Sequence, residues 1–380
     1  MKNPDNHIFD QTPETMAAWA EKVGMPKFRA DQILEWIYQK DVIDPAGMSN
    51  LSKLDREKLA SSFTFLSGHT IQDLEATDGT RKLLVEWDDG NTVAQSESFM
   101  SLPIAGQLEA GDSSRQTECV MIPVEDRKTA CISSQVGCPV GCRFCASGLT
   151  GLDANLSAGR IVEQVWRLGR LPGVPRITNV VFMGMGEPLA NFDNVIRSIR
   201  TMAGLWALGI SARKITISTV GLPKYIERLA NEFELPVTLA LSLHAPNDEI
   251  RRQLIPWAEY CTIDELLKSC QKWFEKTGRE ITLEYTLLRG VNDRPEHARQ
   301  LAEVCSNIRA NVNLIRYNEV EGLPFQRPKD DDVRKFQEFL KARQINTHIR
   351  SSRGRDIKAA CGQLRHENKS KKAVGSEAGT

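Results

Sequence analysis

Three cysteines stand close together in the segment GCPVGCRFCASG, at positions 138, 142 and 145. Three thiolates at this spacing can each bind one iron of a cubane [4Fe–4S] cluster and leave the fourth iron open to another ligand. Structural zinc normally takes four ligands, often as paired CxxC motifs, and the sequence offers no matching pair. A chance grouping of loop cysteines is the other alternative. The triplet therefore favours an iron–sulfur centre held by Cys138, Cys142 and Cys145.

The remaining cysteines fit reactive or metal chemistry better than a disulfide framework. The chain holds nine cysteines, and five of them lie between positions 119 and 145. An odd number, in a chain without a secretory signal core, argues against structural disulfides. Clustered cysteines in a reducing compartment are typical of metal or redox chemistry. Cys131 and Cys361 are candidates for such a role, although small buried core residues are the usual fate of cysteine.

Composition and charge place the chain among soluble globular proteins. It has 380 residues, of which 41% are hydrophobic and 26% are charged, and its formal net charge is zero. No apolar run is long enough to span a membrane, and the polar N-terminus lacks a signal core, so we expect a cytoplasmic protein. The balanced charge does not by itself favour nucleic-acid binding. Basic residues gather from position 350 onward, and we expect residues 365–380 to form a basic, flexible tail.

The pattern of elements predicts an α/β fold with two domains. Residues 1–110 are expected to form a small, mainly helical accessory domain, with helices between 13 and 65 and a hairpin made of 82–87 and 92–94. Residues 103–112 are a plausible linker. From 111 to 364, strands and helices alternate, which requires parallel strands with right-handed crossovers. Strands are expected at 129–133, 177–183, 214–218, 237–243, 280–287, 311–317 and 347–350, with helices at 157–168, 192–203, 223–231, 263–276, 295–308 and 330–344. Six or seven such units favour an open, partial (β/α)6 barrel.

Polar and small residues follow four of the expected strands. Gly186 and Glu187 follow the strand at 177–183, Ser218 ends the next one, Ser242 to His244 end the third, and Asn318 follows 311–317. Parallel barrels bind ligands at the carboxyl ends of their strands, so these side chains are expected on one face. A glycine turn allows close backbone approach, and a carboxylate can accept hydrogen bonds from an amine or a ribose. The sequence therefore predicts a cofactor pocket at this face.

Several motifs together resemble one known family. The segments SSQVGCPVGCRFCASG, MGMGEPLANFDNV, SLHAPNDEIR and AACGQL are similar to those of the RlmN/Cfr family of radical S-adenosylmethionine (SAM) RNA adenine methyltransferases. The resemblance covers roughly residues 118–364, and the N-terminal helical region fits the accessory domain of the family. It implies an open radical SAM barrel, one [4Fe–4S] cluster and SAM chelated at the open iron. The implied SAM contacts are Gly186, Glu187, Ser218, Ser242, Leu243, His244 and Asn318.

The resemblance also implies a catalytic set. Cys361 matches the cysteine that carries the methyl group, Cys131 matches the thiol that resolves the protein–RNA adduct, and Glu118 matches the proton acceptor. A ring carbon of an adenine amidine is electrophilic, so it cannot take a methyl cation directly from SAM. A carbon radical on a methylated cysteine can add to that carbon, and a second thiol can release the product by attacking the first sulfur. The alternative for both cysteines is burial in the core, and for Glu118 an ordinary surface position.

The implied substrates are RNAs. Family members methylate an adenosine of 23S rRNA, and the RlmN branch also methylates an adenosine of tRNA. Methylation at C2 is expected; methylation at C8, as in the Cfr branch, stays open, and so does a radical SAM activase that does not act on RNA. We expect flavodoxin or ferredoxin as electron donor and a monomeric enzyme. Candidate phosphate contacts are Arg160, Arg167, Arg170, Arg176 and the segment 351–355.

Overall fold

A ten-stranded sheet forms the centre of the molecule, and a computed structural model describes it for residues 1–89 and 112–364. Its strand order is β1-β2-β3-β4-β7-β8-β9-β10-β11-β12, and the strands from β4 to β12 are parallel. The strands are β1 (Gly68–Glu75), β2 (Arg81–Trp87), β3 (Gln116–Val124), β4 (Arg127–Cys131), β7 (Asn179–Phe182), β8 (Ile215–Thr219), β9 (Thr238–Ser242), β10 (Ile281–Leu287), β11 (Ala310–Arg316) and β12 (Thr347–Arg350). The expected open, partial α/β barrel is confirmed.

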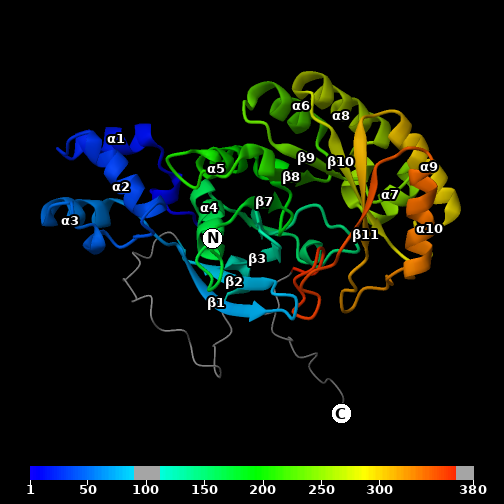
Figure 1. The fold of residues 1–380 in the computed structure, drawn as a ribbon, viewed down its shortest axis with the longest axis horizontal. Helices are drawn as coiled ribbons and strands as arrows, with labels where there is room; N and C mark the ends of the chain where they lie inside the picture. The colour runs from blue at the N-terminus through cyan, green and yellow to red at the C-terminus, as the bar shows by residue number, and fades with distance from the viewer. Residues whose placement is uncertain (90–111, 365–380) are drawn as a thin grey trace, which may run out of the picture.

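Helices connect the successive parallel strands and cover the outside of the barrel (Figure 1). They are α4 (Ala158–Leu168), α5 (Phe192–Ala203), α6 (Pro223–Glu232), α7 (Asp248–Leu254), α8 (Ile263–Thr277), α9 (Pro295–Ser306) and α10 (Asp330–Lys341). Local chemistry fixes several of their starts. Ser157 caps α4, and Thr262 forms a capping box with Glu265 at the start of α8. These side chains satisfy backbone N–H groups that have no partner within the helix.

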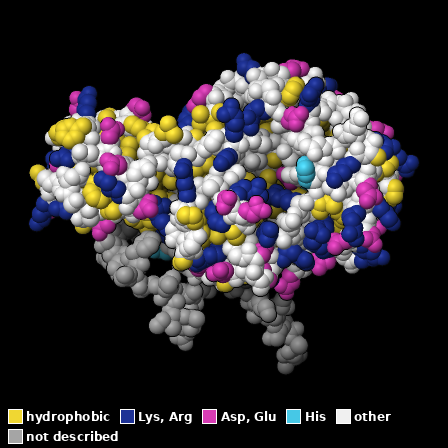
Figure 2. Space-filling model, viewed as in Figure 1, with side chains coloured by type: hydrophobic (Ala, Val, Ile, Leu, Met, Phe, Trp, Pro, Cys, Tyr) yellow, Lys and Arg dark blue, Asp and Glu magenta, His cyan; other side chains and the backbone are white. Residues whose placement is uncertain are grey.

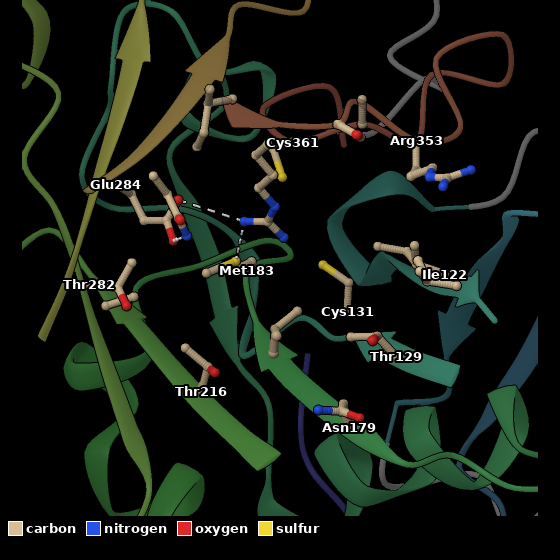
Figure 3. Close-up of a pocket in the computed structure, with 18 of the residues that line it drawn as sticks. Ile122, Thr129, Cys131, Asn179, Met183, Thr216, Thr282, Glu284, Arg353 and Cys361 are labelled. Atoms are coloured by element: carbon tan, nitrogen blue, oxygen red, sulfur yellow. Dashed lines mark hydrogen bonds and ion pairs between the residues drawn. The ribbon is translucent and has the colours of Figure 1, made fainter. Parts of the chain in front are cut away.

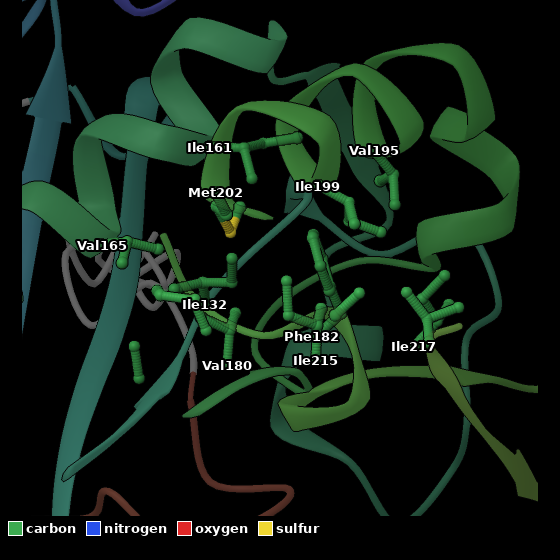
Figure 4. Packing of buried hydrophobic residues seen from close by; sticks show 14 of the residues in the cluster. Ile132, Ile161, Val165, Val180, Phe182, Val195, Ile199, Met202, Ile215 and Ile217 are labelled. Atoms are coloured by element: carbon green, nitrogen blue, oxygen red, sulfur yellow. The ribbon is translucent and has the colours of Figure 1, made fainter. Parts of the chain in front are cut away.

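The core lies between the helices and the outer face of the sheet. Figure 4 shows Ile161 and Val165 of α4, and Val195 and Ile199 of α5, packed over strand residues such as Val180. Alternate residues of a strand point to opposite faces, so the neighbouring positions of the same strands point into the barrel. The polar side chains of the barrel interior are therefore positioned by burial of the apolar outer face.

The N-terminal helices pack against this same core. They are α1 (Pro13–Lys22), α2 (Phe28–Tyr38) and α3 (Lys53–Ser62), and Figure 1 shows them at one end of the molecule. Phe9 is fully buried and its ring lies 5.9 Å from the ring of Trp166 on α4. The apolar residues of this region and of the barrel helices belong to one cluster. A continuous core thus fixes the N-terminal helices against the barrel.

Some expected elements were wrong or missed. Strand 82–87 exists as β2, but it pairs with β1 and β3 rather than in a hairpin with 92–94; those residues, and nearly all of the expected linker 103–112, lie outside the described residues. Glu118 was expected on a strand without stated bounds, which is β3; α7 and the short pair β5 (Gln135–Gly137) and β6 (Leu152–Asn155) were not expected. Among the described residues, no helix is long and apolar enough to cross a bilayer.

Candidate functional site

The cysteine triplet lies on the loop between β5 and β6, and the antiparallel pairing of these two short strands closes the base of the loop. Gly137 pairs with Leu152, and the N–H of Cys138 donates a hydrogen bond to the Gly151 carbonyl over 2.8 Å. Gly137 has a φ of +76°, and a Cβ at this position would lie 2.0 Å from the Gly151 oxygen. Only glycine fits here. The loop that carries Cys138, Cys142 and Cys145 is therefore anchored at its base.

Apolar residues surround the three thiols. The cysteines pack against a cluster that includes Val140 and Phe144. Burial raises the pKa of Cys138 to about 12 and raises the pKa of Cys142 and Cys145, and neighbouring thiols raise each pKa further because a second thiolate nearby is unfavourable. Iron binding must release these protons, as thiolate coordination of metals does.

The donor set suits a cluster better than a single ion. All three donors are cysteine sulfurs, which are the usual protein ligands of iron–sulfur clusters. A cubane cluster bonds each thiolate to a different iron, so its ligands stand further apart than those of one ion. Three neighbouring thiols on a partly buried loop fit such a cluster.

The glycine turn after β7 touches the segment that leads to the cysteines. Gly186 has a φ of +105°, and a Cβ there would lie 2.7 Å from both Gln135 Cβ and Ser134 Oγ. The neighbouring Glu187 is buried, and its carboxylate accepts hydrogen bonds from the N–H groups of Leu189 and Val220. Burial raises the pKa of Glu187 to about 7, although these bonds lower it. Backbone donors thus hold this carboxylate beside the cysteine loop.

The expected pocket residues of the next two strands are neighbours. Ser218 Oγ at the end of β8 lies 3.4 Å from Ser242 Oγ at the end of β9. His244 is buried with a φ of +55°; its Nδ1 accepts a hydrogen bond from the Thr286 N–H, which leaves the proton on Nε2. Burial and the charge of Arg251 lower the pKa of His244 to about 3. The histidine is therefore a neutral donor near the barrel mouth.

The backbone of Leu243, beside His244, makes two hydrogen bonds that hold the end of β9 in place. Its side chain is fully buried, its N–H donates to the Glu284 carbonyl over 3.1 Å, and its carbonyl accepts a hydrogen bond from Arg251 over 3.3 Å. The same arginine donates to the Val220 carbonyl over 2.7 Å. Arg251 thus ties the end of β9 to the end of β8.

Asn318 joins the barrel mouth to the C-terminal loop. Its side-chain amide donates to the backbone carbonyl of Cys361 over 3.2 Å. The same loop docks on the cysteine loop, because Ala146 N–H donates to the Gly362 carbonyl over 2.8 Å and Ser147 Oγ donates to the Leu364 carbonyl over 2.6 Å. These contacts place Cys361 next to the triplet, more than 200 residues away in the sequence.

Cys131 and Cys361 line one cavity of about 620 Å³ and are both free thiols. In Figure 3 both sulfur atoms point into this cavity. Cys131 is buried at the end of β4, and burial, with a smaller contribution from Cys361, raises its pKa to about 12. The positive charge of Arg350 lowers the pKa of Cys131 and so opposes this effect. The structure therefore brings the two candidate thiols together.

Arg350 and Glu284 belong to this site; Arg350 was expected only as part of a basic run, and Glu284 was missed from the sequence. Arg350 Nη1 lies 3.7 Å from Glu284 Oε2 and 3.1 Å from Met183 Sδ, the contacts drawn at Glu284 and Met183 in Figure 3. The nearby Cys361 and Glu284 favour the guanidinium cation and raise the pKa of Arg350. Asn313 donates a hydrogen bond to the other carboxylate oxygen of Glu284. Single charged residues in separate strands give no motif, so only the fold reveals them.

Glu118 is buried rather than on the surface. Its carboxylate lies 2.7 Å from the ammonium of Lys82, and both side chains are 3% exposed. Its N–H approaches Met185 Sδ in the glycine turn at 3.5 Å. A buried carboxylate needs a cationic partner, because an unpaired charge in the protein interior is strongly destabilising. The structure thus places Glu118 inward and identifies Lys82 as its partner, which the sequence did not indicate.

The cavity is strongly basic. Its lining includes five Arg or Lys side chains, His348 and one carboxylate, that of Glu284; the basic ones are Arg127, Arg213, Lys214, Arg350 and Arg353. Figure 2 shows Lys and Arg side chains on both sides of a hollow over the barrel. Such a lining attracts polyanions although the chain as a whole is neutral.

The arginines suggested as phosphate contacts mostly serve the fold. Arg160 is fully buried and bonds to Ser67 and Asn3. Arg167 pairs with Glu163. Arg170 pairs with Asp41 and bonds to the Trp166 carbonyl, and Arg176 donates to two carbonyl groups, those of Leu208 and Gly209. In the 351–355 segment, by contrast, Ser351, Ser352 and Arg353 line the cavity.

Comparison with known proteins places the chain in a family. Residues 132–302 match the model of the radical SAM superfamily, and residues 6–64 match that of the ribosomal RNA large subunit methyltransferase N-terminal domain. The chain is 40% identical over 366 residues to a probable dual-specificity RNA methyltransferase RlmN of Gloeobacter violaceus, covering 96% of this chain and 97% of that protein. The chain belongs to the RlmN family.

Two further similar proteins support this assignment. The dual-specificity RNA methyltransferase RlmN of Pseudomonas putida is 39% identical, covering 94% of this chain and 89% of that protein. The crystal structure of a radical SAM methyltransferase from Sphaerobacter thermophilus superposes with a TM-score of 0.85 at 38% identity, covering 95% of this chain and all of that one. Both similarities thus extend over nearly the whole chain.

Proposed function

We propose that this protein is a radical SAM methyltransferase that methylates C2 of an adenine in 23S rRNA and in tRNA. The observation that carries the proposal is that Cys361 meets Cys131 and the cysteine-triplet loop, from which it is more than 200 residues away in the sequence. The relatives from Gloeobacter violaceus and Pseudomonas putida, named as a probable and a dual-specificity RNA methyltransferase, support RNA as the substrate class.

The site would hold two groups. Cys138, Cys142 and Cys145 would hold a [4Fe–4S] cluster, and Gly186, Glu187, Ser218, Ser242, Leu243, His244 and Asn318 would hold SAM. When bound and reduced, the cluster supplies the electron that cleaves SAM to a 5′-deoxyadenosyl radical. The buried carboxylate of Glu187 faces the same region as the triplet and suits the ammonium group of SAM.

The residues of the chain then divide the work of methyl transfer. Cys361 takes a methyl group from SAM through its sulfur and presents that methyl to the base. The 5′-deoxyadenosyl radical would take a hydrogen atom from that methyl, giving 5′-deoxyadenosine, and the methylene carbon would then bond to the ring. The adduct would return one electron to the oxidised cluster, and Glu118 accepts the proton of the ring carbon, which restores the aromatic ring. Cys131 attacks the Cys361 sulfur as a thiolate; the sulfur–carbon bond breaks, its electron pair stays on the methylene carbon, and a proton completes the methyl group. A Cys131–Cys361 disulfide remains, which a two-electron reductant must reopen.

The basic cavity suits a nucleotide turned out of its stack. Adenine chemistry at a ring carbon requires the base to leave its neighbours, and phosphates on both sides then meet Arg127, Arg213, Lys214 and Arg353. Flavodoxin or ferredoxin is the proposed electron donor, the protein is proposed to act as a monomer in the cytoplasm, and residues 1–110 are proposed as an accessory domain to the core of 111–364.

One experiment tests this proposal. The protein is reconstituted anaerobically with iron, sulfide and SAM, incubated with rRNA and with tRNA under a reductant, and the RNA is digested to nucleosides. We expect 2-methyladenosine from both RNAs. 8-Methyladenosine would overturn the assignment to C2, and the absence of any methylated adenosine from cluster-loaded protein would overturn the proposed activity.

A further inference from the structure

Lys82 is buried at the edge of the site and contacts two parts of it. Its ammonium lies 2.7 Å from Glu118 Oε1 and donates a hydrogen bond to the backbone carbonyl of Lys358 over 3.3 Å. The second contact is three residues before Cys361. A lysine is rarely this buried unless its charge is paired. The position therefore joins the proposed base to the loop that carries the proposed methyl carrier.

The register of the sheet explains this placement. In the antiparallel pair of β2 and β3, Lys82 lies opposite Val120, and Leu84 lies opposite Glu118, so Lys82 and Glu118 are diagonal neighbours on one face. Val120 in turn lies opposite Cys131 on β4. Opposite residues of neighbouring strands share a face. Lys82, Glu118 and Cys131 therefore point to the same side of the sheet.

The turn before Lys82 also holds the C-terminal loop. Asp78 accepts a hydrogen bond from the Gly354 N–H over 3.1 Å, and the Thr77 N–H donates to Asp356 over 2.9 Å. A Cβ at Gly354 would lie 2.8 Å from Thr80 Cγ2, so this loop packs closely on the turn. The hairpin of β1 and β2 thus supports the loop from position 354 to 358, and Lys82 extends that support toward Cys361.

We propose that Lys82 is a positioning residue for methyl transfer: it holds the Glu118 carboxylate ionised and in place, and it ties that carboxylate to the loop that carries Cys361. This inference rests on the proposed function. A carboxylate in a dry site keeps its proton unless a cation or donors stabilise the charged form. A protonated Glu118 has no free site for the proton of the adenine ring carbon. Lys82 therefore acts through Glu118 and touches neither substrate nor cofactor.

The test compares Lys82→Met with the parent, using Lys82→Arg as the charge-preserving variant and the exposed Lys335→Met as control. Methyl loading of Cys361 precedes proton removal, so mass spectrometry should find the loading of Lys82→Met within about twofold of the parent, while turnover of RNA at pH 7 falls by about tenfold. The turnover of Lys82→Arg should lie between that of the parent and that of Lys82→Met. The KM for RNA should stay near that of the parent.

Two readouts separate positioning from a general structural defect. In Lys82→Met the acid limb of the pH–turnover profile should move to higher pH, because the buried carboxylate loses the cation 2.7 Å away. In a double-mutant cycle with Glu118→Gln, the substitution of Lys82 should have little further effect on turnover. The Lys82→Met/Glu118→Gln double variant carries no unpaired buried charge, so it also provides a folded reference.

Failure of this inference is distinguishable from failure of the proposed function. Normal turnover and an unchanged pH profile in Lys82→Met would overturn the role of Lys82 while the parent still methylates RNA. A loading step that falls by the same factor as turnover would also overturn it, since Lys82 would then support the fold alone. If the parent itself makes no methyladenosine, the proposed function fails instead.

Discussion

Glu163 of α4 is expected to contribute about 3 kcal/mol to stability through the contact between the N-terminal region and the barrel. Its fully buried carboxylate accepts five hydrogen bonds: one from His7 Nε2, two from Ser67, and two from the guanidinium of Arg167. His7 and Ser67 precede the barrel, so this one side chain fastens both to α4. Glu163→Gln replaces an acceptor oxygen by an amide that must point at one of these donors.

The magnitude follows from the pKa of Glu163. Burial opposes ionisation, but Arg167, His7 and Ser67 more than offset it and lower the pKa from 4.5 to about 2. At 1.36 kcal/mol for each pH unit, this difference corresponds to about 3 kcal/mol. Because the folded pKa is the lower one, the stabilisation is complete above pH 4.5 and is lost as the pH falls toward 2. The stability that Glu163→Gln is expected to lose at neutral pH agrees with the roughly 3–5 kcal/mol that breaking a buried ion pair costs.

Urea unfolding of the parent and of Glu163→Gln measures this contribution. At pH 7 the free energy of unfolding should differ by about 3 kcal/mol, and at pH 3 the difference should narrow to roughly half. The exposed Glu303→Gln serves as the matched control and should change stability by less than about 0.5 kcal/mol. A difference below about 1 kcal/mol at pH 7, or one that stays constant down to pH 3, would refute the reasoning.

Three further substitutions test the site. Cys361→Ala removes the sulfur that carries the methyl group, so incorporation of labelled methyl from SAM into RNA should stop; continued incorporation would contradict the cysteine relay. Gly186→Ala should weaken equilibrium SAM binding by about tenfold or more, because its backbone is left-handed and crowded. Gly173→Ala, at a left-handed glycine with open space around it, should bind SAM normally, and equal affinities of the two variants would count against the pocket. Arg353→Ala should weaken RNA binding and reduce the slope of log affinity against log salt by about one, whereas an unchanged slope would exclude a phosphate contact.

The barrel was predictable because its strands and helices carry strong periodic patterns. The expected helix at 192–203 coincides with α5, and the expected strands from 177 onward lie within two residues of β7 to β12. The hairpin at 82–94 failed because Asp88-Asp89-Gly90 reads as a turn, while long-range pairing assigns both edges of β2 to β1 and β3. Strand pairing depends on the whole sheet, so local turn chemistry does not settle it.

The candidate site was predictable only where residues form motifs. Spacing singled out the cysteine triplet, and the carboxyl ends of parallel strands brought Ser218 beside Ser242 as expected. Lys82 and Glu284 escaped detection because a charged residue in a strand usually faces solvent. Each is buried because a group of opposite charge from a distant part of the chain compensates it, and that partner becomes visible when the chain is folded.

The central claim is that Cys138, Cys142 and Cys145 hold a [4Fe–4S] cluster with one iron open to SAM. Electron paramagnetic resonance of the anaerobically reconstituted and reduced protein, recorded with and without SAM, tests it most directly. We expect a [4Fe–4S]⁺ signal whose g values shift when SAM is added, and the loss of that signal when the three cysteines are replaced by alanine. A protein that binds zinc instead, or a cluster whose signal SAM leaves unchanged, would contradict it.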